Sequence, residues 1–314
     1  MAPKRFMLPF AAALILIQAL SSGVDAGQPP VSRRTTGPCS PGDHTVRFTA
    51  DGEAHEALLH VPPGANKRLP LVVAFHGARY GAHFVSIYYG LSRLGDRKGF
   101  AVLYPEASHN VFWQLPPEQI EDVDAARVLL DQVEQQACVD SSRVYATGAS
   151  NGGGFTARLG CELADRLAAI APVAGGYAPL GPCNPSRPLP VLEIHGTRDQ
   201  VVPYAGKGPD RDGSVARFLG EWTELDGCTG GARRTTFSRG VAKLLWSHCA
   251  GGSVVEHLRL AQTNHGWPGG DSTGAGFKNP VPSEDVTGVD AAAVVWEFLS
   301  RFRLPAAAAA AGRP

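Results

Sequence analysis

The chain has 314 residues, and its 29 basic side chains are balanced by 29 acidic ones. This neutrality excludes a general electrostatic attraction to nucleic acid or to an anionic membrane surface. The 44% share of hydrophobic residues excludes an intrinsically disordered chain, because such chains combine low hydrophobicity with high net charge. Composition therefore predicts a globular protein with enough residues for a substantial core.

The first 26 residues (1–26) have the pattern of a secretory signal peptide. Lys4 and Arg5 precede an apolar run from Phe6 to Leu20, and Val24-Asp25-Ala26 offers small side chains to a signal peptidase. The run is short for a helix that crosses about 30 Å of hydrocarbon, so cleavage is favoured over a membrane anchor. We expect a secreted, extracellular protein, with the periplasm as an alternative, that has no membrane contact after cleavage.

The remainder is expected to form one domain between two irregular ends. Residues 27–42, rich in Pro, Ser, Thr and Arg, are expected to be a flexible lead-in, and the alanine-rich residues 305–314 a disordered tail. Residues 43–304 contain no linker, charge block or internal repeat. We therefore expect a single catalytic domain over 43–304.

Apolar runs alternate with helical patterns through this domain. Strands are expected at His55–Val61, Leu71–Phe75, Ala101–Tyr104, Arg143–Thr147, Leu167–Pro172 and Val191–Ile194, and helices at Asp122–Gln136, Asn151–Ala164, Val215–Leu225 and Val289–Phe302. Several of these strands are continuously apolar, as expected for a parallel sheet covered on both faces. The pattern predicts the α/β class, a doubly wound and mostly parallel central sheet with helices on both faces.

All six cysteines follow the signal segment. An even number in an exported chain favours three disulfides, although six cysteines allow 15 pairings that sequence alone does not distinguish. The only pair we favour is Cys228 with Cys249, because each lies beside a glycine-rich turn and the segment between them could return as a hairpin; either cysteine pairing elsewhere is the alternative. No spacing matches a zinc-ligand pattern, so we expect no metal site.

The strongest chemical signal is Gly148-Ala149-Ser150-Asn151-Gly152. This segment follows the expected strand Arg143–Thr147 and precedes the helix that begins near Asn151. A serine on such a strand-to-helix turn is held in a strained backbone with its oxygen exposed, and the helix start offers N–H groups and a positive dipole end. Ser150 is therefore the candidate nucleophile; the alternative is a glycine-rich turn whose serine only caps the helix.

A nucleophilic serine needs a base and an orienting carboxylate, which in this strand–turn–helix context follow in the order Ser, acid, His. Asp199 comes just after the apolar strand Val191–Ile194 and is the favoured acid, with Asp210 and Asp212 in a Gly/Pro-rich loop as alternatives. His265 lies in a loop after the strand-like segment Val254–Leu260 and is the favoured base. The alternatives are His257, which alternates with apolar residues as an ordinary strand residue does, and His248, beside Cys249.

The loop after an early strand is the expected source of an oxyanion hole. The strand Leu71–Phe75 runs into His76-Gly77-Ala78, so a backbone N–H of Gly77 or Ala78 is expected to act together with the N–H of Asn151. His76 itself is expected to pack beneath the site.

Several sequence motifs of this chain resemble those of a known family. They are His76-Gly77, Tyr104-Pro105, Trp113, Asp122-Val-Asp124, Arg143-Val-Tyr-Ala-Thr-Gly-Ala-Ser-Asn-Gly-Gly153, Ala169-Ile-Ala-Pro-Val-Ala-Gly175, His195-Gly-Thr-Arg-Asp199, Val202-Pro-Tyr204 and His265-Gly-Trp-Pro268. In this order, over roughly residues 39 to 302, they resemble secreted α/β-hydrolases that group feruloyl esterases with polyhydroxybutyrate (PHB) depolymerases.

The resemblance implies the α/β-hydrolase fold and a triad of Ser150, Asp199 and His265. The oxyanion loop, Gly77-Ala-Arg-Tyr-Gly81, has fewer glycines than is usual in the family, which leaves the second donor open. Asn151-Gly152 after the nucleophile is more similar to the feruloyl esterase branch than to the polymer depolymerases.

Several aromatic residues are expected to form the substrate site. Trp267 is the strongest of them because it lies two positions from the expected base. The set of candidate walls is Trp113, Trp267 and Tyr204, with Tyr80, Tyr88 and Tyr89 as further members. For all of them except Trp267, packing in the core or on the surface is an equal alternative.

The sequence thus predicts a secreted serine carboxylic-ester hydrolase that works through an acyl-enzyme. We expect feruloyl-esterase-like cleavage of esters on plant cell-wall polysaccharide such as xylan, or of a small soluble ester. A polyhydroxybutyrate depolymerase is the first alternative; a serine peptidase of the same fold and a non-catalytic secreted binding protein are further ones. We expect a monomer that needs no metal or organic cofactor and has no nucleic-acid partner.

Overall fold

The computed structural model describes residues 40–65, 67–108, 111–136, 138–208, 213–237, 240–271 and 287–305. The expected signal peptide, nearly all of the expected lead-in and tail, and the alternative acids Asp210 and Asp212 lie outside the described residues. Among the helices that are described, none combines the length and the apolar character needed to span a bilayer.

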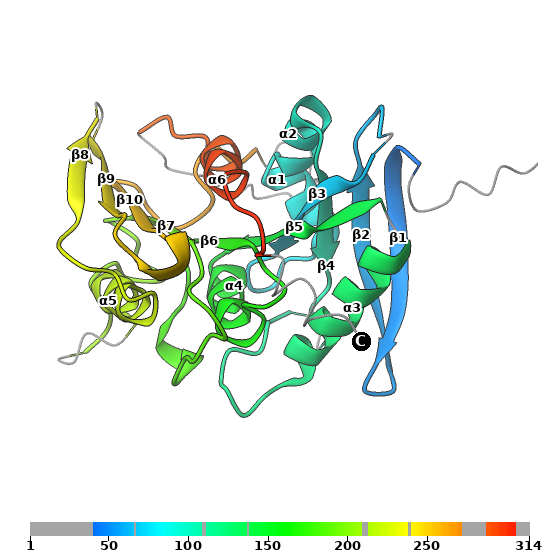
Figure 1. The fold of residues 1–314 in the computed structure, drawn as a ribbon, viewed down its shortest axis with the longest axis horizontal. Helices are drawn as coiled ribbons and strands as arrows, with labels where there is room; N and C mark the ends of the chain where they lie inside the picture. The colour runs from blue at the N-terminus through cyan, green and yellow to red at the C-terminus, as the bar shows by residue number, and fades with distance from the viewer. Residues whose placement is uncertain are drawn as a thin grey trace, which may run out of the picture. The chain divides into compact units, whose positions relative to one another are not determined.

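One ten-stranded sheet organises the described part of the chain (Figure 1). Its strands are β1 (Gly42–Ala50), β2 (Glu53–Val61), β3 (Leu69–Phe75), β4 (Ala101–Pro105), β5 (Val139–Ala149), β6 (Ala169–Val173), β7 (Val191–Gly196), β8 (Arg233–Thr236), β9 (Val241–Trp246) and β10 (Val255–Leu260). They lie in the order β1-β2-β4-β3-β5-β6-β7-β10-β9-β8. The run from β4 to β10 is parallel, and antiparallel pairs β1–β2 and β9–β8 flank it at the two edges.

Six helices cover the two faces of this sheet (Figure 1). They are α1 (Ala82–Tyr88), α2 (Leu91–Lys98), α3 (Glu121–Gln136), α4 (Asn151–Glu162), α5 (Val215–Leu225) and α6 (Ala291–Leu299). One apolar core joins α3, α4 and α5 to the sheet, and a second joins α1, α2 and α6 to it. Successive strand residues point to opposite faces, which is why Leu71 and Val73 belong to the first core while Val72 and Ala74 belong to the second.

This architecture confirms the predicted α/β class with a mostly parallel sheet and helices on both faces. All six expected strands and all four expected helices are present, with ends that differ by a few residues; β5 extends from Val139 to Ala149, and α6 ends at Leu299. The strands β1 and β8 and the short helices α1 and α2 had not been predicted. In β1, alternate residues Val46, Phe48 and Ala50 are buried against the first core.

Two disulfides join described residues. Cys228 pairs with Cys249, which confirms the one pairing favoured from the sequence, and Cys161 pairs with Cys183. Cys138 is also disulfide-bonded. The first bridge ties the end of α5 to the segment after β9, and the second ties α4 to the loop before β7. Both therefore brace the layer that carries α4 and α5.

Candidate active site

Ser150 occupies a sharp turn between β5 and α4. Its φ of 60° and ψ of −121° are unusual for a residue with a side chain, and such strain is typical of a nucleophile held at a tight turn. The turn brings backbones together closely. A Cβ on Gly148 would lie 2.6 Å from the carbonyl oxygen of Phe75, and one on Gly152 would collide with the carbonyl oxygens of Phe75 and His76. Glycine is therefore required on both sides of the serine.

His265 and Asp199 are in direct contact. The loop after β10 carries His265, whose Nδ1 lies 2.7 Å from Asp199 Oδ2. Asp199 follows β7, and its other oxygen accepts hydrogen bonds from the backbone N–H groups of Val201 and Val202, at 2.9 and 2.8 Å. With Nδ1–H donated to the carboxylate, the other ring nitrogen of His265 is the one that can accept a proton.

Asp199 stays ionised although it is buried. Burial by itself raises the pKa of this carboxyl, but hydrogen bonds from His195 and His265 outweigh it and hold the pKa well below its ordinary value. An orienting carboxylate must carry its charge to stabilise an imidazolium, so this environment suits the expected role.

Ser150 and His265 line the same cavity of about 220 Å³. Its wall is largely aromatic and comes from α1 and from the loops after β3 and β10. Tyr80 stacks on Phe84 with ring centroids 4.5 Å apart, and Tyr89 stacks on Trp267 at 4.1 Å. The full lining is Gly77, Ala78, Tyr80, Phe84, Val85, Tyr88, Tyr89, Ala149, Ser150, Val201, His265, Gly266 and Trp267.

The expected oxyanion loop lies against the serine. Gly77 and Ala78 both line the cavity, and a Cβ placed on Gly77 would be 3.6 Å from the Cβ of Ser150. Asn151 is the first residue of α4, where backbone N–H groups have no intrahelical partner. The Asn151 side chain binds the backbone of Trp113: Oδ1 accepts a hydrogen bond from the Trp113 N–H at 2.7 Å, and Nδ2 donates one to the Trp113 carbonyl at 3.1 Å.

His76 packs beneath this loop. The residue is fully buried; its Nδ1 donates to the Gly77 carbonyl at 2.9 Å, and its Nε2 accepts from the Ala107 N–H at 3.3 Å. Burial lowers the pKa of His76, which favours the neutral form that donates one hydrogen bond and accepts the other. It supports the oxyanion loop rather than competing with His265.

The expected substrate walls divide into two groups. Trp267, Tyr80, Tyr88 and Tyr89 line the cavity, whereas Trp113 and Tyr204 are not among its lining residues. Trp113 is buried against Phe155 and His76, with its indole N–H donated to the His76 carbonyl at 2.9 Å. The expectation for these two is corrected accordingly: Trp113 packs in the core, and Tyr204 packs against His257, its hydroxyl 2.8 Å from Nε2.

Sequence reasoning missed a buried ionic cluster behind Asp199. Glu193 and His195, at alternate positions of β7, are fully buried, and Glu193 also contacts His257 of β10. The available signal was two ionisable residues inside an otherwise apolar parallel strand, where charges are rare unless they are paired.

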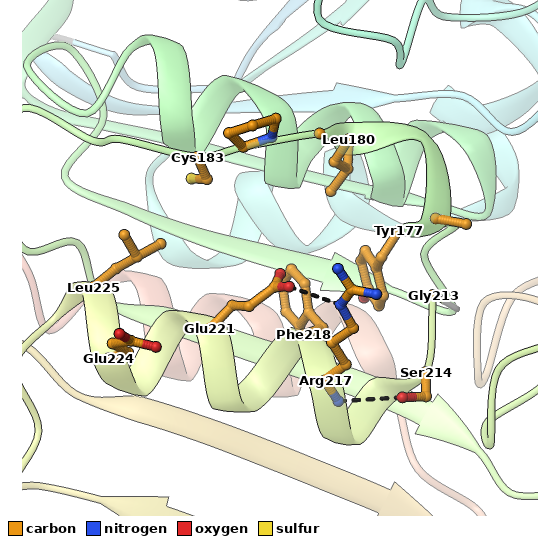
Figure 2. A pocket seen from close by; sticks show the side chains of 13 residues that line it. Tyr177, Leu180, Cys183, Gly213, Ser214, Arg217, Phe218, Glu221, Glu224 and Leu225 are labelled. Carbon is orange, nitrogen blue, oxygen red and sulfur yellow. Dashed lines mark hydrogen bonds and ion pairs between the residues drawn. The ribbon is translucent and has the colours of Figure 1, made fainter. Parts of the chain in front are cut away.

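A larger cavity among the described residues lies elsewhere. It measures about 520 Å³ and lies between α5 and the loop after β6 (Figure 2). Tyr177 stacks on Phe218 in its wall, and Arg217 pairs with Glu221 at 2.9 Å. None of the three expected catalytic residues lines it, so size does not identify the site. Among the described residues, no group of three or more His, Cys, Asp and Glu side chains is arranged to hold a metal ion.

A protein-family model matches part of this chain. The model of the family "Esterase PHB depolymerase" matches residues 55–178, the segment that contains the oxyanion loop and Ser150. Residues 55–178 are therefore similar to this family. The resemblance stated from the sequence motifs is thereby confirmed.

Curated relatives come from the same group. Feruloyl esterase B from Piromyces equi is 28% identical over 268 residues, which is 80% of this chain and 46% of the relative. A bifunctional acetylxylan esterase/xylanase from Neocallimastix patriciarum is 26% identical over 68% of this chain and 31% of the relative. Feruloyl esterase D from Neurospora crassa is 28% identical over 61% of this chain and 69% of the relative. The chain thus spans less than half the length of the first two.

Solved structures share the fold. An acetyl xylan esterase from Aspergillus awamori superimposes with a TM-score of 0.56 at 13% identity, covering 71% of this chain and 94% of that one. Esterase 2 of Thermogutta terrifontis, phosphorylated by paraoxon, gives a TM-score of 0.55 at 15% identity, covering 83% and 94%. These likenesses confirm the α/β-hydrolase fold.

Proposed function

We propose that this protein is a carboxylic-ester hydrolase in which Ser150, His265 and Asp199 form a catalytic triad. The observation that carries the proposal is the shared cavity: a serine on a strained strand-to-helix turn and a histidine bonded to a buried aspartate line one pocket. The expected chain order, the match of residues 55–178 to the Esterase PHB depolymerase model and the esterase names of the relatives support the same reaction.

The proposed reaction is acyl transfer in two halves. His265 takes the proton of Ser150 as the serine oxygen attacks the ester carbonyl, and the negative charge on the carbonyl oxygen is held by backbone N–H groups of the Gly77–Ala78 loop and Asn151. The imidazolium then protonates the departing alcohol. In the second half, His265 deprotonates a water that hydrolyses the acyl-enzyme, while Asp199 keeps Nδ1–H in place and stabilises the imidazolium.

For the substrate, we propose a feruloyl-type ester on a plant cell-wall polysaccharide such as xylan. Aromatic side chains dominate the cavity wall, and Tyr80, Phe84 and Tyr88 form a continuous stack along it. A pocket of about 220 Å³ is smaller than the roughly 300–1,000 Å³ of drug-sized ligand sites, so it suits a single-ring acyl group. Flat aromatic walls favour an aromatic acid over the aliphatic hydroxybutyryl unit of a polyester.

Labelling and substrate profiling test the proposal. A fluorophosphonate probe should label the wild type and not Ser150→Ala, and equal labelling of both would exclude the triad. A panel of methyl ferulate, acetylated xylan, short p-nitrophenyl esters and polyhydroxybutyrate then separates the substrates. We expect methyl ferulate to give the highest kcat/KM; cleavage of the polyester alone would favour the depolymerase reading instead.

We also propose that the protein is exported. The disulfides Cys161–Cys183 and Cys228–Cys249 suit an oxidising compartment, as does the signal-like pattern of residues 1–26. N-terminal sequencing of protein recovered from an expressing culture should begin near Gly27. Recovery of an uncleaved chain from the cytoplasm would contradict export.

A further inference from the structure

A cluster of buried ionisable side chains lies next to Asp199. Glu193 and His195 alternate along β7 and so point to the same face of the sheet. On the neighbouring parallel strand β10, His257 stands opposite Glu193. The side chains of Glu193 and His257 are fully buried and that of His195 is 1% exposed. The proposed reaction gives these three residues no role.

Both ring nitrogens of His195 face acceptors. Nδ1 lies 2.9 Å from Glu193 Oε1, while Nε2 lies 2.9 Å from the Val202 carbonyl and 3.2 Å from Asp199 Oδ2. In a neutral imidazole, one ring nitrogen carries no hydrogen. In His195 the lone pair of that nitrogen would face an acceptor oxygen and repel it. The geometry therefore requires an imidazolium. Burial opposes this charge, but Glu193 and Asp199 raise the pKa of His195 to about 10.

Glu193 anchors this imidazolium. Besides His195, its carboxylate receives the hydroxyl of Tyr177 at 3.0 Å and lies 2.6 Å from His257 Nδ1. Burial raises the pKa of Glu193, but His257 and His195 outweigh it and lower the pKa to about 2. Two buried carboxylates thus flank one buried cation, the arrangement in which buried charges are tolerated.

We propose that His195 is a positioning residue of the catalytic pair: its imidazolium, held by Glu193, fixes the Asp199 carboxylate and opposes protonation of His265. The inference rests on the proposed function, in which neutral His265 is the base. His195 and His265 contact the same oxygen of Asp199, at 3.2 and 2.7 Å, so their nearest nitrogens are less than about 6 Å apart. At that distance a fixed positive charge strongly disfavours a second one.

The remaining charged and titratable groups around His195 come from the segments packed on it. Arg259 stands opposite His195 on β10, with its guanidinium 5.9 Å from the ring centre of Tyr204. The groups that face the cluster are Glu193 on β7, His257 and Arg259 on β10, Tyr177 after β6, and Asp199 and Tyr204 in the segment after β7. Among these described groups, His195 is the one whose ring lies against the Asp199 carboxylate.

The test compares His195→Gln with His257→Gln. Glutamine keeps a donor for the neighbouring oxygens but removes the charge. Without this charge, His265 in the free enzyme should take up a proton more readily. The acid limb of the pH profile of kcat/KM for p-nitrophenyl acetate should therefore have its midpoint about one to two pH units higher, with KM unchanged. His257→Gln alters the same buried cluster without touching Asp199, and its acid limb should stay at the wild-type position.

A second measurement reads the charge without using activity. In ¹⁵N-histidine spectra of Ser150→Ala, one histidine should keep both ring nitrogens protonated at pH 8.5. Competing signals are removed by replacing two other histidines with glutamine: His60, which lies between Asp43 and Asp96, and His257, whose Nδ1 lies 2.6 Å from Glu193 Oε2. This readout also applies if His195→Gln does not fold.

The outcomes separate the two proposals. An unchanged acid limb in folded His195→Gln, an equal shift in both variants, or the absence of a doubly protonated histidine at pH 8.5 would each overturn the role of His195. Undiminished fluorophosphonate labelling of Ser150→Ala would instead overturn the proposed function, because the spectra of that variant report only the buried charge.

Discussion

Tyr89 links the end of β3, the Ser150 turn and the loop that carries His265, and Tyr89→Phe tests how much that link contributes. Its hydroxyl donates to the Phe75 carbonyl at 3.0 Å and accepts from the Ala149 N–H at 3.1 Å. The hydroxyl thus bridges β3 and β5 at the ends that precede the oxyanion loop and Ser150. Its ring stacks on Trp267, close to His265. Burial raises the pKa of Tyr89 far above its usual value, so the hydroxyl remains a donor.

The expected loss of stability follows from two backbone groups that lose their hydrogen-bond partner, the Phe75 carbonyl and the Ala149 N–H. Phe75 and Ala149 are 1% and 5% exposed, so water does not readily replace the hydroxyl. A buried polar group left without a partner costs about 1–3 kcal/mol, so the two groups together should lower the free energy of unfolding of Tyr89→Phe by about 2–6 kcal/mol. Loss of the bridge also loosens the turn that aims Ser150, and we expect kcat to fall at least about tenfold with little change in KM.

Urea unfolding and hydrolysis of p-nitrophenyl acetate measure both effects. Tyr88→Phe is the matched control, because its hydroxyl has one long contact, 3.4 Å from the Trp267 N–H. The control should lose less than about 1 kcal/mol. The reasoning would be refuted if Tyr89→Phe kept both wild-type stability and wild-type kcat, or if Tyr88→Phe lost as much as Tyr89→Phe.

Three further predictions follow from other contacts. Gly152→Ala should abolish esterase activity or folding, because the added Cβ would collide with two backbone carbonyl oxygens at the end of β3. Gly176→Ala is the control: its Cβ would have no heavy atom within 4 Å, so the variant should keep activity and the wild-type circular dichroism spectrum. Burial raises the pKa of Asp226 to about 6, so its contribution to stability is complete below about pH 4 and is lost as the pH rises through 6. Asp226→Asn removes this dependence on pH. The free energy of unfolding in urea of Asp226→Asn minus that of the wild type should therefore rise by about 3 kcal/mol from pH 4 to pH 7. If this difference stayed constant over that range, the assignment would be contradicted. Replacing Cys228 and Cys249 together by alanine opens a loop with a sequence separation of 21 and should lower the free energy of unfolding by about 3 kcal/mol, while an unchanged midpoint would show that the bridge does not restrict the unfolded chain.

The sequence was sufficient for features that depend on order along the chain. In a parallel sheet every strand delivers its following loop to the same edge, so a serine, an aspartate and a histidine that each follow a strand are expected to meet there. The contact between His265 and Asp199 and the placing of Ser150 and His265 on one cavity agree with that expectation. The glycines around Ser150 are likewise local requirements of a tight turn.

Features that depend on which face a side chain occupies could not be predicted. Trp113 and Trp267 both stand in loops without periodicity, and nothing local distinguishes the one that packs under His76 from the one that lines the cavity. The helix α1 was missed for a related reason. It has seven residues, four of them buried, and includes β-branched and aromatic residues of modest helix propensity, so packing rather than propensity forms it.

The alternation of β7 explains why the site can combine an apolar pocket with buried charge. Leu192 and Ile194 point to the face that carries α1 and the aromatic cavity, while Glu193 and His195 point to the opposite face. The acyl group would therefore bind among rings that exclude water, and the charges that orient Asp199 would act through the sheet edge without lining the pocket. Electrostatic interactions strengthen where water is excluded. The sheet thus keeps the aromatic cavity on one face apart from the charged Glu193–His195 cluster on the other. The apolar cavity can then strengthen the pairing of His265 with Asp199, and its described lining adds no charge that would compete with that pair.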